Sequence, residues 1–224
     1  MGVWCWPACR RAGILTAVPK ITRLVRQAKD PSRVSVFLED SFAFGISQRL
    51  AVQLGLAKGN ELTQDQQQAI AAASAEEKEY ERVLRLLAMR AHARAELLKK
   101  LQARGVASEV ALRAVDRAQA EGYVDDGAFA RDFARQGRDL KSWAPARAKL
   151  ELRRRGIAPD TIEQALEAVY TETDLYDVAL QLARARARRI TGEREARRRR
   201  LAAFLSRRGF PTDICRRAVD EVAP

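Results

Sequence analysis

The feature that most constrains the fold of this chain is one short phrase that occurs three times. The segments "LQARGV", "LRRRGI" and "LSRRGF" each end in an arginine, a glycine and an apolar residue, and the glycines are Gly105, Gly156 and Gly209. They are about fifty residues apart, a period that is typical of repeat architectures. Residues 76–224 are therefore predicted to form a series of similar units.

Each phrase has the chemistry of a helix end that is followed at once by a new helix. A glycine just past a helix adopts the left-handed conformation, and a cation in the last turn interacts favourably with the negative end of the helix dipole. The arginines before the glycines are assigned to this role; they are Arg104, Arg155 and Arg208. The apolar residues after the glycines supply the hydrophobic contact of such a stop; they are Val106, Ile157 and Phe210.

Each unit has room for three helices. We expect them near 76–90, 93–104 and 108–121, then 126–138, 145–155 and 159–170, then 174–190, 194–208 and 212–222. Apolar pairs spaced by four residues occupy equivalent places in the middle helices and should face inward; they are Leu97/Leu101, Ala148/Leu152 and Leu201/Leu205. Cys215 is equivalent to Ala111 and Ile162 and is interpreted as a core residue, not a nucleophile.

Residues 21–62 have a different pattern. Val34, Val36 and Leu38 alternate with polar residues, which predicts a strand. Phe42, Phe44 and Ile46 alternate in the same way and are predicted to share one face of a second strand, with a turn at 39–41. Residues 21–28 are a plausible third strand. Ser47 and Thr63 are expected to cap two short helices.

The predicted fold is therefore mainly α: three tandem three-helix, helix-turn-helix-like repeats preceded by a small three-stranded α+β region. The expected divisions are a disordered or mis-assigned leader at 1–19, the β-containing region at 20–75, and repeats at 76–122, 123–172 and 173–224. No apolar run approaches the ~18 residues of a membrane span.

Basic charge is high and uneven. The net charge is +12, which favours polyanionic partners. Residues 141–156 and 184–200 are rich in arginine and lysine, whereas 157–183 contain neither. One interpretation is a set of solvated helix faces whose opposite charges meet across neighbouring helices. The other is a basic stripe along the array that binds an extended polyanion. The run Arg197–Arg200 favours this second interpretation, because four adjacent arginines repel one another.

The groups that enzymes use are scarce. His92 is the single histidine, the cysteines Cys5, Cys9 and Cys215 form no CxxC pair, and no phosphate-binding glycine loop occurs. The pair Asp125-Asp126 precedes an apolar helix, where capping explains it better than catalysis. We predict no catalytic residue, no metal and no cofactor, and the cysteine usage favours a reducing cytoplasm.

Four helical segments of the chain together resemble the RecX family, the regulators of the RecA recombinase: "ERVLRLLAMRAHARAELLKKLQARGV", "GYVDDGAFARDFAR", "PARAKLELRRRGIAPDTIEQAL" and "RRRRLAAFLSRRGFPTDICRRAV". The segment "RVSVFLEDSFAFGIS" is similar to the β-containing extension of its longer members. Ser41 stands where the family usually has glycine, and Trp143-Ala144 stand where it more often has Lys-Gly.

The resemblance implies a curved array that binds along the groove of the RecA–single-stranded-DNA filament. It also implies inhibition of ATP hydrolysis, strand exchange and coprotease activity, and hence an effect on DNA repair and the SOS response. Direct contact with single- or double-stranded DNA stays open, and a monomer is the default. The family offers no short binding motif, so the contact residues are predicted from charge: Lys99, Lys100, Lys149, Arg153, Arg154, Arg198, Arg199, Arg200 and Arg207. The alternative function is an autonomous helix-turn-helix DNA-binding protein.

Overall fold

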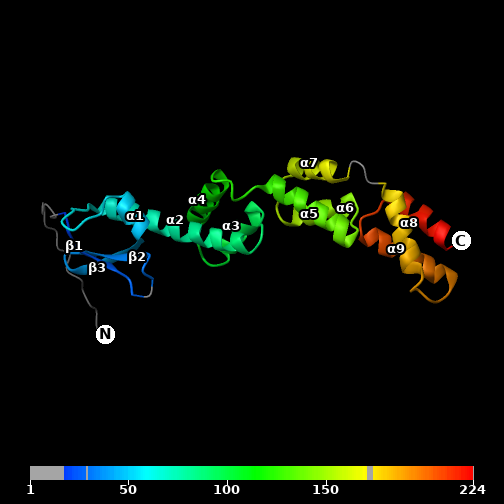
Figure 1. The fold of residues 1–224 in the computed structure, drawn as a ribbon, viewed down its shortest axis with the longest axis horizontal. Helices are drawn as coiled ribbons and strands as arrows, with labels where there is room; N and C mark the ends of the chain where they lie inside the picture. The colour runs from blue at the N-terminus through cyan, green and yellow to red at the C-terminus, as the bar shows by residue number, and fades with distance from the viewer. Residues whose placement is uncertain (1–17, 29, 171–173, 224) are drawn as a thin grey trace, which may run out of the picture. The chain divides into compact units, whose positions relative to one another are not determined.

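The structure, a computed structural model, describes residues 18–28, 30–170 and 174–223. The leader predicted at 1–19 lies outside the described residues except for Val18 and Pro19. Contacts divide the chain into two units between Glu77 and Lys78, and each unit is described separately. The described part is mostly helical, with one small sheet at its N-terminal end (Figure 1).

The first unit contains a three-stranded antiparallel sheet in the order β1-β2-β3, which confirms the predicted hairpin and third strand. The strands are β1 (Ile21–Arg26), β2 (Arg33–Leu38) and β3 (Ser41–Ser47). Glu39 and Asp40 form the turn with φ of +46° and +60°. Two central residues with positive φ match the twist of the strands, so the turn is tight although neither residue is glycine.

The predicted orientation of Phe42 is wrong. Val34, Val36 and Leu38 are buried as expected, and Phe44 and Ile46 face the same core. The register shifts between Val36 and Phe37, so that Val36 pairs with Phe44 but Phe37 pairs with Phe42. One extra residue in a strand moves the side chains beyond it to the other face of the sheet. Phe42 therefore points outward and is 60% exposed.

Two helices complete this unit. Ser47 caps α1 (Gln48–Gln53) by accepting a hydrogen bond from the backbone N–H of Leu50, as predicted. Thr63 and Gln66 exchange the reciprocal bonds of a capping box at the start of α2 (Gln64–Met89). The expected helix at 76–90 is the C-terminal half of this one continuous helix. Leu50, Ala51, Leu62 and Ile70 pack on the inner face of the sheet.

The second unit contains eight further helices within the described residues, and they confirm the three-helix repeats. They are α3 (Arg94–Gln102), α4 (Ser108–Ala120), α5 (Asp126–Lys141), α6 (Pro145–Arg154), α7 (Pro159–Tyr170), α8 (Leu175–Ala187), α9 (Arg194–Arg207) and α10 (Thr212–Val222). Repeat 1 comprises the end of α2 with α3 and α4, repeat 2 comprises α5–α7, and repeat 3 comprises α8–α10. Each repeat buries its own apolar cluster, and the predicted inward pairs, Leu97/Leu101, Ala148/Leu152 and Leu201/Leu205, are almost fully buried.

The three predicted helix joints are confirmed. Gly105, Gly156 and Gly209 have φ of +78°, +78° and +86°, values that L side chains rarely adopt. The N–H of the following apolar residue donates to a carbonyl five residues back in each joint, as a Schellman stop requires; the pairs are Val106–Leu101, Ile157–Leu152 and Phe210–Leu205.

The joints also connect successive repeats. A Cβ atom added to Gly156 would lie 2.5 Å from the Cβ of Ala95 in repeat 1, and one added to Gly209 would meet Arg147 in repeat 2. Gly105, in the first repeat, has nothing within 4 Å. The N-cap residues of α3 and α6 also connect repeats, because each packs in the core of the following repeat. Ala93 lies in the core of repeat 2 and Ala144 in that of repeat 3.

Candidate nucleic-acid interface

A hollow between α8 and α9 is lined mainly by arginines. Its volume is about 310 Å³, and its lining consists of Arg186, Arg189, Ile190, Thr191, Arg200, Ala203 and Arg207. Arg186 lies on α8, Arg189 in the loop after it, and Arg200 and Arg207 on α9. Arg200 is held in place by a hydrogen bond of 3.0 Å from its Nη1 to the carbonyl oxygen of Thr191. We call this site the α8–α9 hollow.

The four guanidinium groups of the α8–α9 hollow have no acidic partner among the residues that the structure describes. None of them forms an ion pair with a carboxylate in the described ranges, whereas Arg184 and Arg198 on the same two helices do. Close like charges disfavour one another unless an anion lies between them. Arginine also presents a planar fork of donors that suits phosphate oxygens. The hollow is therefore a favourable place for an anionic group.

A second basic hollow lies beside the first, where repeats 2 and 3 meet. Its volume is about 440 Å³, and its lining consists of Leu140, Lys141, Trp143, Arg147, Arg207 and Arg208. Arg207 lines both hollows, so they form one surface that runs from α8 to the end of α5. We call the second site the α5–α9 hollow.

Trp143 is the aromatic wall of the α5–α9 hollow. The Nζ of Lys141 lies 4.6 Å from its ring centroid, and the guanidinium carbon of Arg147 lies 5.7 Å away. Gly137 makes room for the ring, because an added Cβ there would lie 2.5 Å from the indole Cε3. An aromatic face next to cations is a combination that nucleic-acid-binding sites use for bases and phosphates.

Two arginines of the α5–α9 hollow are incompletely satisfied. The Nε atoms of Arg147 and Arg208 are buried and have no hydrogen-bond partner among the described residues. Burial lowers the pKa of Arg208, and the neighbouring cations Arg186 and Arg207 lower it further. Buried donors without partners cost free energy. An anion bound here would offset the repulsion between the neighbouring cations.

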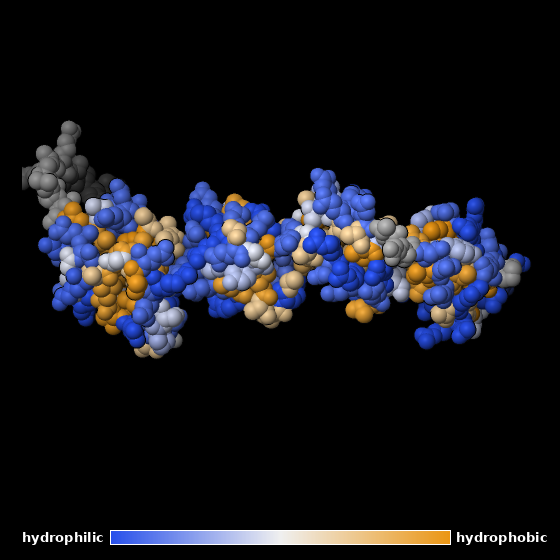
Figure 2. All heavy atoms as spheres, turned by 45° about the horizontal axis from the view of Figure 1, so that its top comes forward, coloured by the Kyte–Doolittle hydropathy of each residue, from blue (hydrophilic) through white to orange (hydrophobic). Residues whose placement is uncertain are grey.

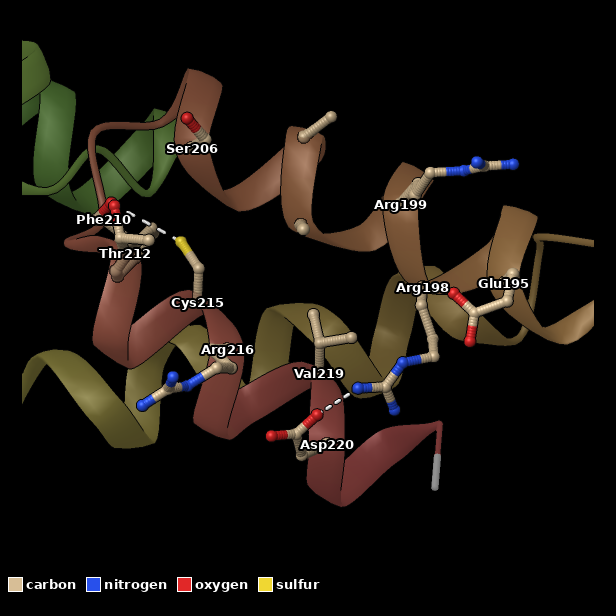
Figure 3. A pocket seen from close by; sticks show the side chains of 12 residues that line it. Glu195, Arg198, Arg199, Ser206, Phe210, Thr212, Cys215, Arg216, Val219 and Asp220 are labelled. Carbon is tan, nitrogen blue, oxygen red and sulfur yellow. Dashed lines mark hydrogen bonds and ion pairs between the residues drawn. The ribbon is translucent and has the colours of Figure 1, made fainter.

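Arg200 and Arg207 are the two predicted contact residues that the structure brings together. Arg198 is placed differently: it reaches across to Asp220 of α10 (Figure 3). It also donates to the carbonyl oxygen of Ala223 at 2.5 Å. Arg199 is exposed and lines the same groove between α9 and α10 as Arg198 (Figure 3). The run Arg197–Arg200 therefore divides between packing and solvent.

The remaining predicted residues lie on other repeats. Lys149 pairs with Glu163 of α7, and Arg154 pairs with Glu151 on its own helix at 3.1 Å. Arg153 is exposed on α6, and Lys99 and Lys100 are exposed in the last turn of α3. These residues do not join the two hollows.

Sequence reasoning missed several residues of the hollows. Arg186 and Arg189 lie in a segment whose density of arginine was noted, but no spacing rule paired them with α9. Lys141 and Arg147 were counted only as part of a basic stretch. Arg208 was assigned to its helix end, which is correct for its backbone, but its side chain stacks 4.0 Å above the ring of Phe204 and lines the α5–α9 hollow.

The residues weighed for catalysis have structural roles. Asp125 caps α5 by accepting from the N–H of Ala128 at 2.9 Å, and Asp126 accepts from the N–H of Arg94 at 2.8 Å. Cys215 is buried in the core of repeat 3, and burial raises the pKa of its thiol. Across the described ranges, no group of acidic, histidine and cysteine side chains is arranged to hold a metal ion, and no helix is long and apolar enough to span a membrane.

Four family models match the chain in the order of its parts. The RecX N-terminal domain matches residues 19–63, and the first, second and third RecX three-helix domains match residues 80–117, 125–166 and 172–219. The matched residues correspond to the sheet-containing unit and to the three helical repeats.

Curated relatives and a solved structure agree with these matches. The regulatory protein RecX of Trichlorobacter lovleyi is 35% identical over 144 residues, which cover 63% of this chain and 94% of the relative. That of Limosilactobacillus reuteri is 29% identical over 208 residues, covering 92% of this chain and 77% of the relative. A crystal structure of regulatory protein RecX superposes with a TM-score of 0.73 at 26% identity, over 90% of this chain and 99% of that one. The chain belongs to the RecX family.

Proposed function

We propose that this protein is a negative regulator of the RecA recombinase that binds along the RecA–single-stranded-DNA filament. The observation that carries the proposal is the continuous basic surface of the α8–α9 and α5–α9 hollows, whose arginines have few acidic partners among the described residues. Membership of the RecX family supplies the recombinase as partner. Bound phosphates of the filament DNA, or carboxylates of the recombinase, would complete the two hollows.

The repeats support a mode of action without site chemistry. Each repeat has its own core and contacts its neighbour at a glycine joint and the helix cap beside it, so successive repeats can contact successive subunits of a helical polymer. A regulator bound to several subunits restrains their relative movement. The expected consequences are slower ATP hydrolysis, strand exchange and coprotease activity, and hence a weaker SOS response and altered DNA repair.

The test is an ATPase assay with RecA on single-stranded DNA. The unchanged protein should suppress hydrolysis at concentrations too low to coat the bare DNA. The double variant Arg200→Glu/Arg207→Glu should suppress it much less at equal concentration, because two cations of the hollows become anions. The pair Lys78→Glu/Arg85→Glu on α2 makes the same change in net charge on exposed residues outside the hollows and should suppress hydrolysis normally.

Two outcomes would contradict the proposal. Undisturbed hydrolysis in the presence of the unchanged protein would remove the recombinase as target, and tight sequence-selective binding to duplex DNA would then favour an autonomous DNA-binding protein. Equal inhibition by Arg200→Glu/Arg207→Glu and Lys78→Glu/Arg85→Glu would move the contact surface away from the hollows.

A further inference from the structure

The outer face of the sheet carries two phenylalanines, of which Phe42 is exposed and Phe37 is half-buried. The bulge in the β2–β3 pairing places Phe42 next to Phe37, with ring centroids 6.0 Å apart in an edge-to-face arrangement. Phe42, on β3, is 60% exposed, and Val25, on β1, is 45% exposed. Exposed apolar groups that lie together on a small domain mark an interaction surface. Figure 2 shows a hydrophobic strip on the part of the molecule that carries the sheet.

The strands of this sheet carry positive charge only, whereas the acidic residues Glu39 and Asp40 lie in the turn between β2 and β3. The guanidinium carbon of Arg23 lies 4.4 Å from the centroid of the Phe37 ring, and Arg33 donates to the carbonyl oxygen of Gly45 at 3.1 Å. The three strands contain no acidic residue, and their only charged residues are Arg23, Arg26 and Arg33. The face therefore combines the exposed ring of Phe42 and the half-buried ring of Phe37 with positive charge, without a carboxylate in the strands to repel an anion.

The geometry points to a binding site for single-stranded nucleic acid on the outer face of the sheet, at Arg23, Phe37 and Phe42. Exposed aromatic side chains on a sheet stack on unpaired bases, and adjacent arginines bind the backbone phosphates. A base can stack on the Phe42 ring. The Arg23 guanidinium, which lies over the adjacent Phe37 ring, can then bind a phosphate of the same strand. A duplex buries its bases, so it gains only the phosphate contacts here.

This site is separate from the two basic hollows, which lie in the second unit. The hollows consist mainly of arginines, whereas the sheet face offers rings and few charges, so the two sites should depend differently on salt. Phosphate contacts weaken as salt increases because they release counterions, whereas stacking does not. The sheet face contributes binding that persists at higher salt.

The experiment measures binding of the full-length protein to a fluorescent oligothymidylate by anisotropy, without recombinase, at several salt concentrations. Phe42→Ala should bind roughly tenfold more weakly, in line with the loss of one stacked base, and its salt dependence should not change. Arg23→Ala should reduce the slope of log affinity against log salt by about 1. Phe42→Tyr retains an aromatic ring and should restore binding.

Val52→Ala is the matched control, because Val52 is an exposed apolar residue of the same unit that lies on α1 instead of the sheet. It should bind the oligothymidylate normally, and Phe42→Ala should bind duplex DNA normally. Equal oligothymidylate binding by Phe42→Ala and the unchanged protein would overturn the inference. So would a Phe42→Ala variant that loses inhibition of the recombinase but binds the oligothymidylate normally, since the face would then contact protein. Because no recombinase is present in the binding assay, its failure leaves the proposed function standing.

Discussion

Gly209, at the helix joint of repeat 3, lies directly against the backbone of Arg147 in repeat 2. A Cβ atom added to the glycine would lie 2.8 Å from the Cβ of Arg147 and closer still to its backbone nitrogen. The same glycine needs a positive φ to end α9. One residue therefore both stops a helix and connects two repeats, and the two roles can be separated by mutation.

Alanine substitutions at the three joint glycines should differ in cost. Gly105→Ala meets only the backbone strain of a positive φ, about 1 kcal/mol, because the space around it is open. Gly209→Ala adds a clash with backbone atoms, which should raise the loss by a further ~2 kcal/mol. Equilibrium unfolding in urea measures both. Equal losses for the two variants would contradict the contact between joint and preceding repeat.

Acid should weaken the contact between repeats 1 and 2. His92 is buried there, its Nδ1 lies 3.2 Å from Oε2 of Glu96, and the Glu96 Oε1 lies 3.6 Å from Nε of Arg155 in repeat 2. Burial, together with Arg90, lowers the pKa of His92 below its usual 6.5. The unfolded chain therefore binds more protons below about pH 6.5, and the free energy of unfolding falls as the pH decreases through that range.

The measurement is urea unfolding at pH 7 and at about pH 5.5. His92→Gln should unfold with less dependence on pH over this interval. Because the chain has one histidine, an NMR titration reports its imidazole without overlap, and a pKa above 6.5 would refute the assignment.

Arg198 and Arg207 should separate stability from binding, although both lie on α9. Arg198→Ala removes the ion pair to Asp220 and the bond to the Ala223 carbonyl, so it should lower the free energy of unfolding by about 1 kcal/mol. Arg207→Ala should leave stability unchanged but weaken DNA binding and reduce its salt slope by about 1. Urea unfolding and anisotropy on the same samples check both statements. The reverse pattern would place the anion-binding surface on the Arg198 side of α9.

Trp143 should report on anions that enter the α5–α9 hollow. Its ring lies beside Lys141 and Arg147, so a bound phosphate changes the electrostatic environment of the indole. The fluorescence difference between the unchanged protein and Trp143→Phe isolates this residue from Trp4 and Trp6. That difference should respond to added DNA and disappear at high salt. A signal that is insensitive to DNA would exclude binding in this hollow.

The features predicted correctly from the sequence are those with local chemistry. A glycine joint depends on residues next to it in the chain, and so do the caps at Ser47, Thr63 and Asp125. The continuous helix α2 could also have been predicted, because the chain has no glycine or proline between Thr63 and Met89.

The features missed depend on residues that are distant in the chain. The outward position of Phe42 results from a bulge in its pairing with β2, and an alternating pattern alone does not contain that shift. Arg186 and Arg207 line one hollow because two helices pack side by side, and Arg198 is occupied because Asp220 lies on the neighbouring helix. A count of charges along the sequence identifies a basic segment but not which of its arginines remain available.

The empty space around Gly105 has a consequence for how such a protein changes length over evolution. The second and third joints of the described helical unit pack against the repeat before them, whereas the first joint has open space around its glycine. If the gene segment that encodes one repeat were duplicated in frame, each new repeat would already have the surfaces that pack against the repeat before it and the repeat after it. Lengthening or shortening by a whole repeat thus requires no newly evolved surface, whereas insertion of half a repeat would leave a joint with nothing to pack against.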